Sequence, residues 1–246
     1  MKRYFVLLVF CLITPVVFGV EIFVSKTGES TGSLCQAVRV KGAWFMTAAH
    51  CVVPSCKNSF CKAEMQVSGE IIEAQKQNIY WLNKARENKT YYDVALINFE
   101  SAKKLPSYTE TPVLILKNID FSVPKILNRR LGITYSSPGE VGQILSRGPV
   151  FYGPKNKIIF SEEMGLEHGI SGAGVMTDRG EIISVVSAVA GQGGKVKFSV
   201  FSAFNEEVEK FLRSHIPSIK TKIVNEKDFE NVPESDIAIV ASLDNN

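Results

Sequence analysis

The chain has 246 residues, enough for one large or two small domains whose core needs no metal or cystine to hold it. Hydrophobic residues make up 45% and charged residues 22%, with 28 Lys and Arg against 25 Asp and Glu. This ordinary globular composition excludes tiny disulfide scaffolds, disordered chains and proteins that coat nucleic acid, and the formal charge of +3 indicates no particular partner.

The first 19 residues are typical of a secretory signal peptide. Two basic residues precede an apolar run over residues 4–13, and the segment ends on Gly19, a small residue that suits signal peptidase. The alternative is a membrane anchor, but Pro15 interrupts the segment, which falls short of the roughly 20 apolar residues that a span requires. We therefore expect a secreted or periplasmic protein that begins at Val20 and keeps no stable membrane anchor.

Short apolar runs that alternate with turn clusters predict a β-rich fold. The turn clusters are made of Gly, Pro, Asn, Asp and Ser, the residues that favour tight turns. Many short strands with such turns are typical of barrels and sandwiches. The predicted strands cover residues 34–40, 44–48, 94–99, 112–116, 141–145, 157–160, 181–189 and 195–201.

One helix is predicted late in the chain. Its apolar residues recur at helical spacing and are Phe204, Val208, Phe211 and Leu212. Ser202 or Asn205 can cap its N-terminus, two glutamates follow in the first turn, and Pro217 ends it.

Four cysteines remain after the signal peptide, and they are Cys35, Cys51, Cys56 and Cys61. In an exported protein four cysteines favour disulfides, for which three pairings exist. The alternative is a zinc site formed by His50 and the last three cysteines, but zinc sites usually show a tighter cysteine pair and a second pair at a distance. We therefore expect cystines and no metal.

Three short stretches carry residue types that commonly serve in catalysis. The stretch Thr47-Ala48-Ala49-His50-Cys51 follows an apolar strand, and Asp93 leads into another. In Gly169-Ile170-Ser171-Gly172-Ala173-Gly174, glycines on both sides of a serine let backbone N–H groups turn toward one point, as an oxyanion hole requires. Each stretch alone also has a purely structural interpretation: an exposed histidine, an aspartate at a strand start and a flexible turn.

In the order His, Asp, Ser, these stretches resemble the trypsin and chymotrypsin family of serine peptidases. The family's pattern is Thr-Ala-Ala-His-Cys, then Asp before an apolar strand, then Gly-Asp-Ser-Gly-Gly-Pro, and the 16-residue spacing from Cys35 to Cys51 matches a cystine of the family. Residues 142–160 are more similar to the bacterial branch that contains glutamyl endopeptidases and HtrA-type proteases. The resemblance implies an all-β fold of two packed six-stranded β-barrels, with a C-terminal helix and the active site in the cleft between the barrels.

The resemblance also implies a division of the chain. Residues 20–110 would form the first barrel, with the histidine and aspartate motifs, and residues 111–217 the second barrel and the helix, with the serine motif. The predicted linker is residues 101–124, which contain several lysines and prolines and few long apolar runs. Residues 218–246 are polar and acidic, and we expect them to form a tail.

The resemblance assigns a role to each residue of the three motifs. Ser171 is the nucleophile, His50 takes its proton, and Asp93 orients the imidazole. The N–H groups of Gly169 and Ser171 form the oxyanion hole. The predicted function is a secreted serine endopeptidase that acts on proteins or peptides without a cofactor and does not bind nucleic acid. We further predict two cystines, the family's bond between Cys35 and Cys51 and a second bond between Cys56 and Cys61.

Substrate preference follows from positions that match the family's binding pocket. Counting back from the serine places Gly165 at the pocket floor and His168 at its rim, while Ser187 and Val189 lie on the substrate-binding strand. Gly165 supplies no acid for Lys or Arg side chains, and Val189 makes the pocket shallow. We therefore expect cleavage after small or medium apolar residues. Val186 stands where glutamyl endopeptidases place a histidine, which argues against cleavage after Glu.

One departure from the family bears on activation. Ile170 replaces the family's aspartate before the serine, so a newly formed N-terminal amine has no acid to pair with. We expect an enzyme that is competent as soon as the signal peptide is removed. The alternative is an inactive relative that serves as a secreted binding module, although none of the three motif residues is lost.

Overall fold

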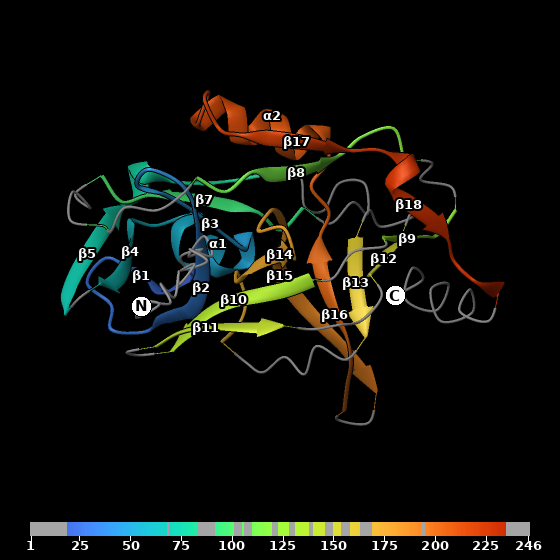
Figure 1. Ribbon diagram of the computed structural model, residues 1–246. Coiled ribbons are helices and arrows are strands. Elements are labelled where there is room, and N and C mark those ends of the chain that lie inside the picture. Colours follow the sequence, from blue (N-terminus) through green and yellow to red (C-terminus); the bar gives the residue numbers. More distant parts are fainter. Residues whose placement is uncertain are drawn as a thin grey trace, which may run out of the picture.

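Two β-sheets and two α-helices make up the part of the chain that the structure describes, a computed structural model shown in Figure 1. The described residues are 19–67, 69–82, 92–100, 105, 110–119, 123–127, 131–137, 140–145, 150–153, 158–162, 169–192 and 195–234. The predicted signal peptide lies outside these ranges except for Gly19. No helix among the described residues is long and apolar enough to cross a membrane.

The first sheet contains seven strands in the order β5-β4-β1-β2-β3-β7-β6. Apolar residues recur at every second position in strands of this sheet. In β4, for example, every second side chain from Cys61 to Met65 is buried in the core. The strands are β1 (Gly19–Lys26), β2 (Gly32–Lys41), β3 (Trp44–Thr47), β4 (Cys61–Val67), β5 (Glu70–Gln75), β6 (Ile79–Trp81) and β7 (Ala95–Asn98).

Helix α1 (Ala49–Cys56) follows β3 directly and was not predicted from the sequence. Ala48 stands at its N-cap without a side-chain hydrogen bond, and Pro54 lies inside the helix, so the usual sequence marks of a helix are missing. Packing against the first sheet forms this helix, since Cys51, Val52 and other residues are fully buried there.

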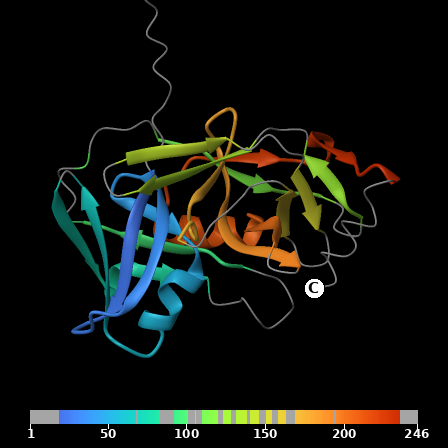
Figure 2. The same ribbon diagram turned by 90° about the horizontal axis from the view of Figure 1, so that it is seen from below.

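The second sheet follows the order β11-β10-β14-β15-β16-β13-β12-β9-β18, and β8 joins it by pairing with β15 and β17. Figure 2 shows its strands, from green to red, beside the blue and teal strands of the first sheet. The strands are β8 (Val113–Leu116), β9 (Lys125–Leu127), β10 (Leu131–Ser137), β11 (Glu140–Leu145), β12 (Val150–Gly153), β13 (Ile158–Glu162), β14 (Gly174–Thr177), β15 (Ile182–Gln192), β16 (Lys195–Ser202), β17 (Thr221–Val224) and β18 (Phe229–Asn231).

Helix α2 (Glu206–His215) confirms the predicted C-terminal helix. Asn205 is its cap, because its side chain accepts hydrogen bonds from the N–H groups of Glu207 and Val208. Although α2 lies between strands β16 and β17 of the second sheet in sequence, its buried residues join the hydrophobic cluster of the first sheet. The helix therefore ties the C-terminal part of the chain to the first barrel.

The expected polar tail is the main correction to the predicted fold. Residues 221–224 form β17, which pairs in parallel with β8, and residues 229–231 form β18, which pairs antiparallel with β9. Val224 and Phe229 are buried in the second core. The apolar residues in this segment are too sparse to predict strands from the sequence. The segment forms strands because β8 and β9 offer edges with which it can pair. Residues 235–246 lie outside the described part.

Two hydrophobic clusters form the cores. One is centred on the first sheet and α1, and the other is formed by the second sheet, with Tyr152 and Phe201 among its largest buried side chains. The predicted all-β architecture of two barrels and a C-terminal helix is confirmed, but the two sheets contain seven and eleven described strands, not six each. The junction between the barrels positions the motifs described next.

Candidate active site

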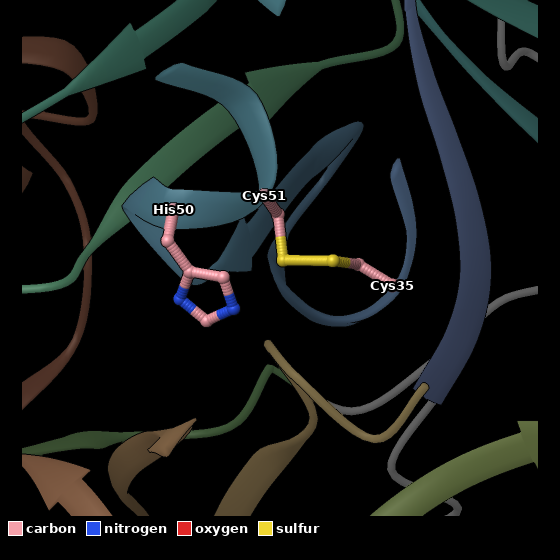
Figure 3. Close-up of side chains that lie close together, drawn as sticks. All are labelled: Cys35, His50 and Cys51. Carbon is pink, nitrogen blue, oxygen red and sulfur yellow. A yellow bond between two sulfur atoms is a disulfide. The ribbon is translucent and has the colours of Figure 1, made fainter. Parts of the chain in front are cut away.

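The first barrel positions His50 through β3 and the start of α1. His50 is the second residue of α1, and the adjacent Cys51 forms a disulfide with Cys35 on β2 (Figure 3). The second disulfide joins Cys56, at the end of α1, to Cys61, at the start of β4. Both predicted pairs are confirmed, and together they hold α1 to the sheet.

The disulfides also decide the question of a zinc site. His50 and the sulfur atoms of Cys35 and Cys51 each offer one ligand atom, and these atoms lie within 4.8 Å of one another. The two sulfur atoms are bonded to each other, at 2.08 Å, so they are not thiolates that could bind a metal. The other two cysteines are likewise joined, which contradicts the alternative of a cysteine-rich zinc site.

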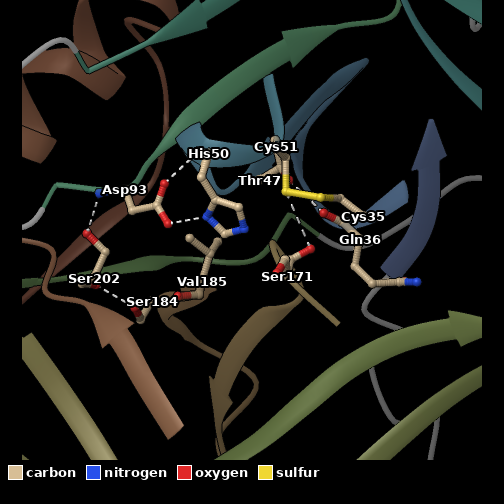
Figure 4. A network of polar contacts seen from close by, with 10 residues as sticks. All are labelled: Cys35, Gln36, Thr47, His50, Cys51, Asp93, Ser171, Ser184, Val185 and Ser202. Carbon is tan, nitrogen blue, oxygen red and sulfur yellow. Dashed lines mark hydrogen bonds and ion pairs between the residues drawn. A yellow bond between two sulfur atoms is a disulfide. The ribbon is translucent and has the colours of Figure 1, made fainter. Parts of the chain in front are cut away.

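Asp93 holds His50 with two contacts (Figure 4). β7 pairs with β3 in a register that sets Ala95 opposite Thr47, and this brings Asp93, two residues before β7, to the start of α1. The N–H of His50 donates to Asp93 Oδ1 at 2.7 Å, and His50 Nδ1 lies 2.6 Å from Asp93 Oδ2. The Asp93 side chain is 5% exposed, whereas that of His50 is 41% exposed. The acid is thus buried and the imidazole is accessible.

The second barrel supports Asp93 from behind. The N–H of Asp93 donates to the hydroxyl of Ser202, at the end of β16, over 3.1 Å. The Ser184 hydroxyl, on β15, donates in turn to the Ser202 carbonyl oxygen (Figure 4). Sequence patterns predict neither of these serine contacts, because buried serines carry no recognisable motif.

Ser171 lies in a loop that docks on both sheets. Its carbonyl oxygen accepts a hydrogen bond from the N–H of Gln36, on β2, at 2.7 Å. The next residue, Gly172, donates its N–H to the Val186 carbonyl oxygen, on β15, at 2.8 Å. Cys51 Sγ lies 3.8 Å from the Ser171 carbonyl oxygen, so the first disulfide borders the same loop (Figure 4).

Ser171 and His50 come to the same place but are not hydrogen-bonded to each other. Within the described part of the chain, neither the Ser171 hydroxyl nor His50 Nε2 has a hydrogen-bond partner. Such a bond is often long or misaligned in a ligand-free enzyme and shortens only when substrate binds.

Two glycines give the serine loop its shape. Gly169 has a φ of +97° and Gly172 a φ of +84°, a region that other residues rarely adopt. A Cβ on Gly172 would also collide with Thr47 Oγ1 and the Gln36 carbonyl oxygen. Among the described residues, no backbone hydrogen bond uses the N–H of Gly169 or Ser171, although the two following N–H groups are both bonded.

The structure covers only part of the predicted binding pocket. Ser187 is buried on β15, and its hydroxyl has no hydrogen-bond partner among the described residues. Gly165 and His168 lie outside the described residues, as does the side chain of Val189, whose backbone pairs with Ser199. Ile170 is half-buried against the second core.

Comparisons with known proteins agree with this architecture. Residues 18–122 match the family model described as Trypsin. No curated protein matches the chain.

Several solved structures share the fold at low sequence identity. The protease Anisep from Arthrobacter nicotinovorans is similar with a TM-score of 0.60 and 14% identity, covering 83% of this chain and 98% of its own. A scabies mite inactivated protease paralogue, S-D1, has a TM-score of 0.54 and 16% identity over 83% of this chain and 94% of its own. A Glu endopeptidase has a TM-score of 0.53 and 14% identity over 80% of this chain and 90% of its own.

Proposed function

We propose that the chain is a secreted serine endopeptidase of the trypsin and chymotrypsin family that works through an acyl-enzyme on Ser171. One observation carries the proposal. A buried carboxylate, Asp93, contacts both the backbone and the ring of an accessible imidazole, His50, and this pair stands beside a serine loop with two left-handed glycines.

His50 acts as the general base in this proposal. An ionised carboxylate only accepts hydrogen bonds, so Asp93 fixes the proton of the neutral imidazole on Nδ1. Nε2 then carries a lone pair and accepts the Ser171 hydroxyl proton as Oγ attacks the substrate carbonyl carbon. Asp93 stabilises the imidazolium that results and does not itself take up the proton.

The oxyanion of the tetrahedral intermediate binds to the N–H groups of Gly169 and Ser171. Their freedom from backbone hydrogen bonds among the described residues supports this assignment. Removing one such donor costs about 3 kcal/mol of transition-state stabilisation in a measured case. Here the donors belong to the backbone, so the conformation of the loop and the φ of Gly169 determine the direction in which the two N–H groups point.

Three further proton transfers complete the reaction. As the peptide C–N bond breaks, the imidazolium of His50 gives its proton to the leaving amine, and the acyl group stays on Ser171 Oγ. A water molecule then attacks the acyl carbon while His50 takes one of its protons. Collapse of the second intermediate returns that proton to Ser171 Oγ and releases the carboxylic acid product.

The finer parts of the proposal concern substrate, domains and location. We propose protein or peptide substrates with small or medium apolar residues before the cleaved bond, recognised by Gly165, His168, Ser187 and Val189. The proposed barrels, residues 20–110 and 111–217, are supported by the sheets, because β7 ends at Asn98 in the first sheet and β8 begins at Val113 in the second. Two cystines support passage through an oxidising compartment.

A binding module without turnover is the second candidate function. It is favoured by the similarity to a structure named as an inactivated protease paralogue, and by the missing hydrogen bond between Ser171 and His50 in the described part. The retained His50–Asp93 pair argues for the enzyme, because a protein that only binds has no use for a buried carboxylate behind an imidazole.

Labelling with a fluorophosphonate separates the two candidates. This reagent phosphonylates a serine only when a neighbouring base activates it, so we expect one adduct on Ser171, located by peptide mass mapping. The Ser171→Ala variant serves as the control and should take no label. A correctly folded, disulfide-bonded chain that takes no label would refute the enzyme and favour the binding module. A peptide library then tests the expected preference for small or medium apolar residues.

A further inference from the structure

The segment between β16 and α2 makes two buried contacts with the residues that carry the acid of the proposed site. Ser202 accepts from the N–H of Asp93, and Asn205 Nδ2 donates to the Tyr92 hydroxyl at 2.6 Å. Tyr92, Asn205 and Ser202 are 3%, 7% and 0% exposed. Two neighbouring residues of the first barrel are thereby held by one short stretch of the C-terminal part of the chain.

Asn205 uses both ends of its side chain. Its Oδ1 accepts the N–H groups of Glu207 and Val208 and so caps α2, while its Nδ2 reaches Tyr92. A cap alone needs only the oxygen, which serine supplies equally well. The amide is therefore the smallest side chain that can cap the helix with its oxygen and also present a donor to the tyrosine.

The first turn of α2 also influences the protonation of Tyr92. Its hydroxyl accepts from Asn205, and burial together with the Glu207 charge raises the pKa of Tyr92 above its usual value. The phenol thus stays protonated throughout the pH range of an assay. Both Asn205 and Glu207 belong to the N-terminal end of α2.

We propose that Asn205 is a positioning residue, which acts through Tyr92 to fix the Asp93 carboxylate against His50. This inference rests on the proposed function of the site. Asp93 contacts the His50 N–H and the His50 ring with its two oxygens, so a small displacement of residues 92 and 93 misaligns both contacts at once. Ser202 holds Asp93 at its N–H, and the contact through Asn205 holds the neighbouring residue as well, so residues 92 and 93 are fixed at two points.

The test is Asn205→Ser in the full chain, because serine keeps the cap but is too short to reach Tyr92. We expect kcat to fall by about 10- to 100-fold, the size of effect that a small misplacement of reacting groups produces, with KM nearly unchanged. The pH at which kcat reaches half its maximum should also move to lower pH, because a displaced carboxylate stabilises the imidazolium less. Tyr92→Phe should reproduce both effects, and the double variant should be no worse than either single one.

Thr221→Val is the matched control. It removes the hydrogen bonds that join Thr221 to Arg213 and Glu209, which loosens the same helix at its other end. We expect a comparable loss in Tm and unchanged kcat and pH profile. If Asn205→Ser does not fold, Tyr92→Phe tests the same contact with the cap intact.

The outcomes distinguish this inference from the proposed function. A wild-type chain that takes no fluorophosphonate label overturns the function, and with it the role of Asn205. A wild-type chain that is labelled and active, with kcat and pH profile unchanged in both Asn205→Ser and Tyr92→Phe, overturns the positioning role alone. Equal losses of kcat in Thr221→Val would also overturn it, since helix stability would then account for the effect.

Discussion

The two halves of the candidate site are held together by different means. Residues His50 and Asp93 both come from the first barrel, where two contacts to a buried carboxylate and two cystines fix them within one sheet. The loop of Ser171 is held by backbone hydrogen bonds to β2 of the first sheet and β15 of the second. The acid–base pair thus comes from one barrel and receives additional support from Ser202 of the second, whereas the serine loop is held by direct backbone hydrogen bonds to both sheets.

Alanine at any one of the three motif residues should have the largest effect on activity. Because the serine, the base and the acid act as a unit, we expect Ser171→Ala, His50→Ala and Asp93→Ala each to lower kcat by about 10⁴-fold or more. Single-turnover kinetics on a peptide ester would measure this loss of kcat. Combining two of these changes should add little. Full activity in a purified Ser171→Ala chain would exclude the acyl-enzyme.

The docking of the serine loop predicts the next largest effect. In Gly172→Ala the new Cβ would meet Thr47 Oγ1 and the Gln36 carbonyl oxygen and would also strain a φ of +84°. We expect a loss of about 3 kcal/mol or more in the free energy of unfolding, together with loss of activity, from strain and overpacking combined. Urea unfolding and labelling of Ser171 measure the two effects.

Gly28→Ala is the matched control for that change. Gly28 has a nearly identical φ of +87°, but a Cβ there would meet nothing within 4 Å. Backbone strain alone should cost about 1–2 kcal/mol and leave activity intact. If Gly28→Ala and Gly172→Ala destabilised the chain equally, the contact between the serine loop and the first barrel would contribute nothing measurable.

The two cystines of the first barrel should differ in their contribution to stability. The Cys35–Cys51 bond spans 16 residues and borders the Ser171 loop, and in a chain-entropy estimate such a loop contributes about 3 kcal/mol. The Cys56–Cys61 bond spans only 5 residues and should contribute less. Paired alanine variants compared by urea unfolding give the difference. A larger loss from the Cys56–Cys61 pair would mean that unfolded-chain entropy does not govern this barrel.

The sequence predicts the first half of the site better than the second. Thr47 to Cys51 follow an apolar strand and match a family pattern, and the cystine spacing supports the match. α1 escapes prediction because an alanine stands at its cap and Pro54 lies within it, so only packing makes it a helix. The strands β17 and β18 are not predicted because they contain few apolar residues and form only by pairing with β8 and β9.

The contacts that join the halves were also beyond the sequence. Ser202 was considered as a helix cap, and the structure gives that role to Asn205 and uses the Ser202 hydroxyl for Asp93. Both residues are possible caps on local grounds, and only the path of the chain across the barrels decides between them. Local patterns therefore predict elements and motifs, while the partners of single buried polar groups require the fold.

The packing of helix α2 against the first barrel should depend on pH. His215 packs against Tyr80, with ring centroids 4.2 Å apart, and against Trp44 and Phe211, and burial lowers the pKa of His215. The unfolded chain then binds a proton more readily than the folded one, so this stability is complete above about pH 6.5 and declines as the pH falls toward the lower folded value. Urea unfolding at pH 7.5 and 5.5 should show a smaller acid loss in His215→Phe than in the wild type. Equal losses would show that this histidine does not couple α2 to pH.

The smallest expected effect concerns the N-terminus, which we predict has no part in forming the serine loop. Gly19 and Val20 pair with Val38 and Ala37 in the first sheet, and Val20 is 4% exposed. Ile170, in the serine loop, carries no charge to receive an amine and instead packs half-buried against the second core, a burial that contributes about 1 kcal/mol. Apolar packing and the backbone hydrogen bonds to β2 and β15 already order the loop in the folded chain.

A short extension before Val20 should accordingly leave kcat/KM nearly unchanged. The measurement compares signal-free chains with and without a few added residues, both checked for intact mass, against the same substrate. The extended chain keeps the β1–β2 pairing, because β1 lies between β2 and β4 and additional residues continue past its end. A large gain in activity only after trimming to a new N-terminus would contradict this prediction. In that case the serine loop would need a partner that the charge-free Ile170 does not supply, and its order would depend on the first barrel's N-terminus rather than on the packing between the barrels.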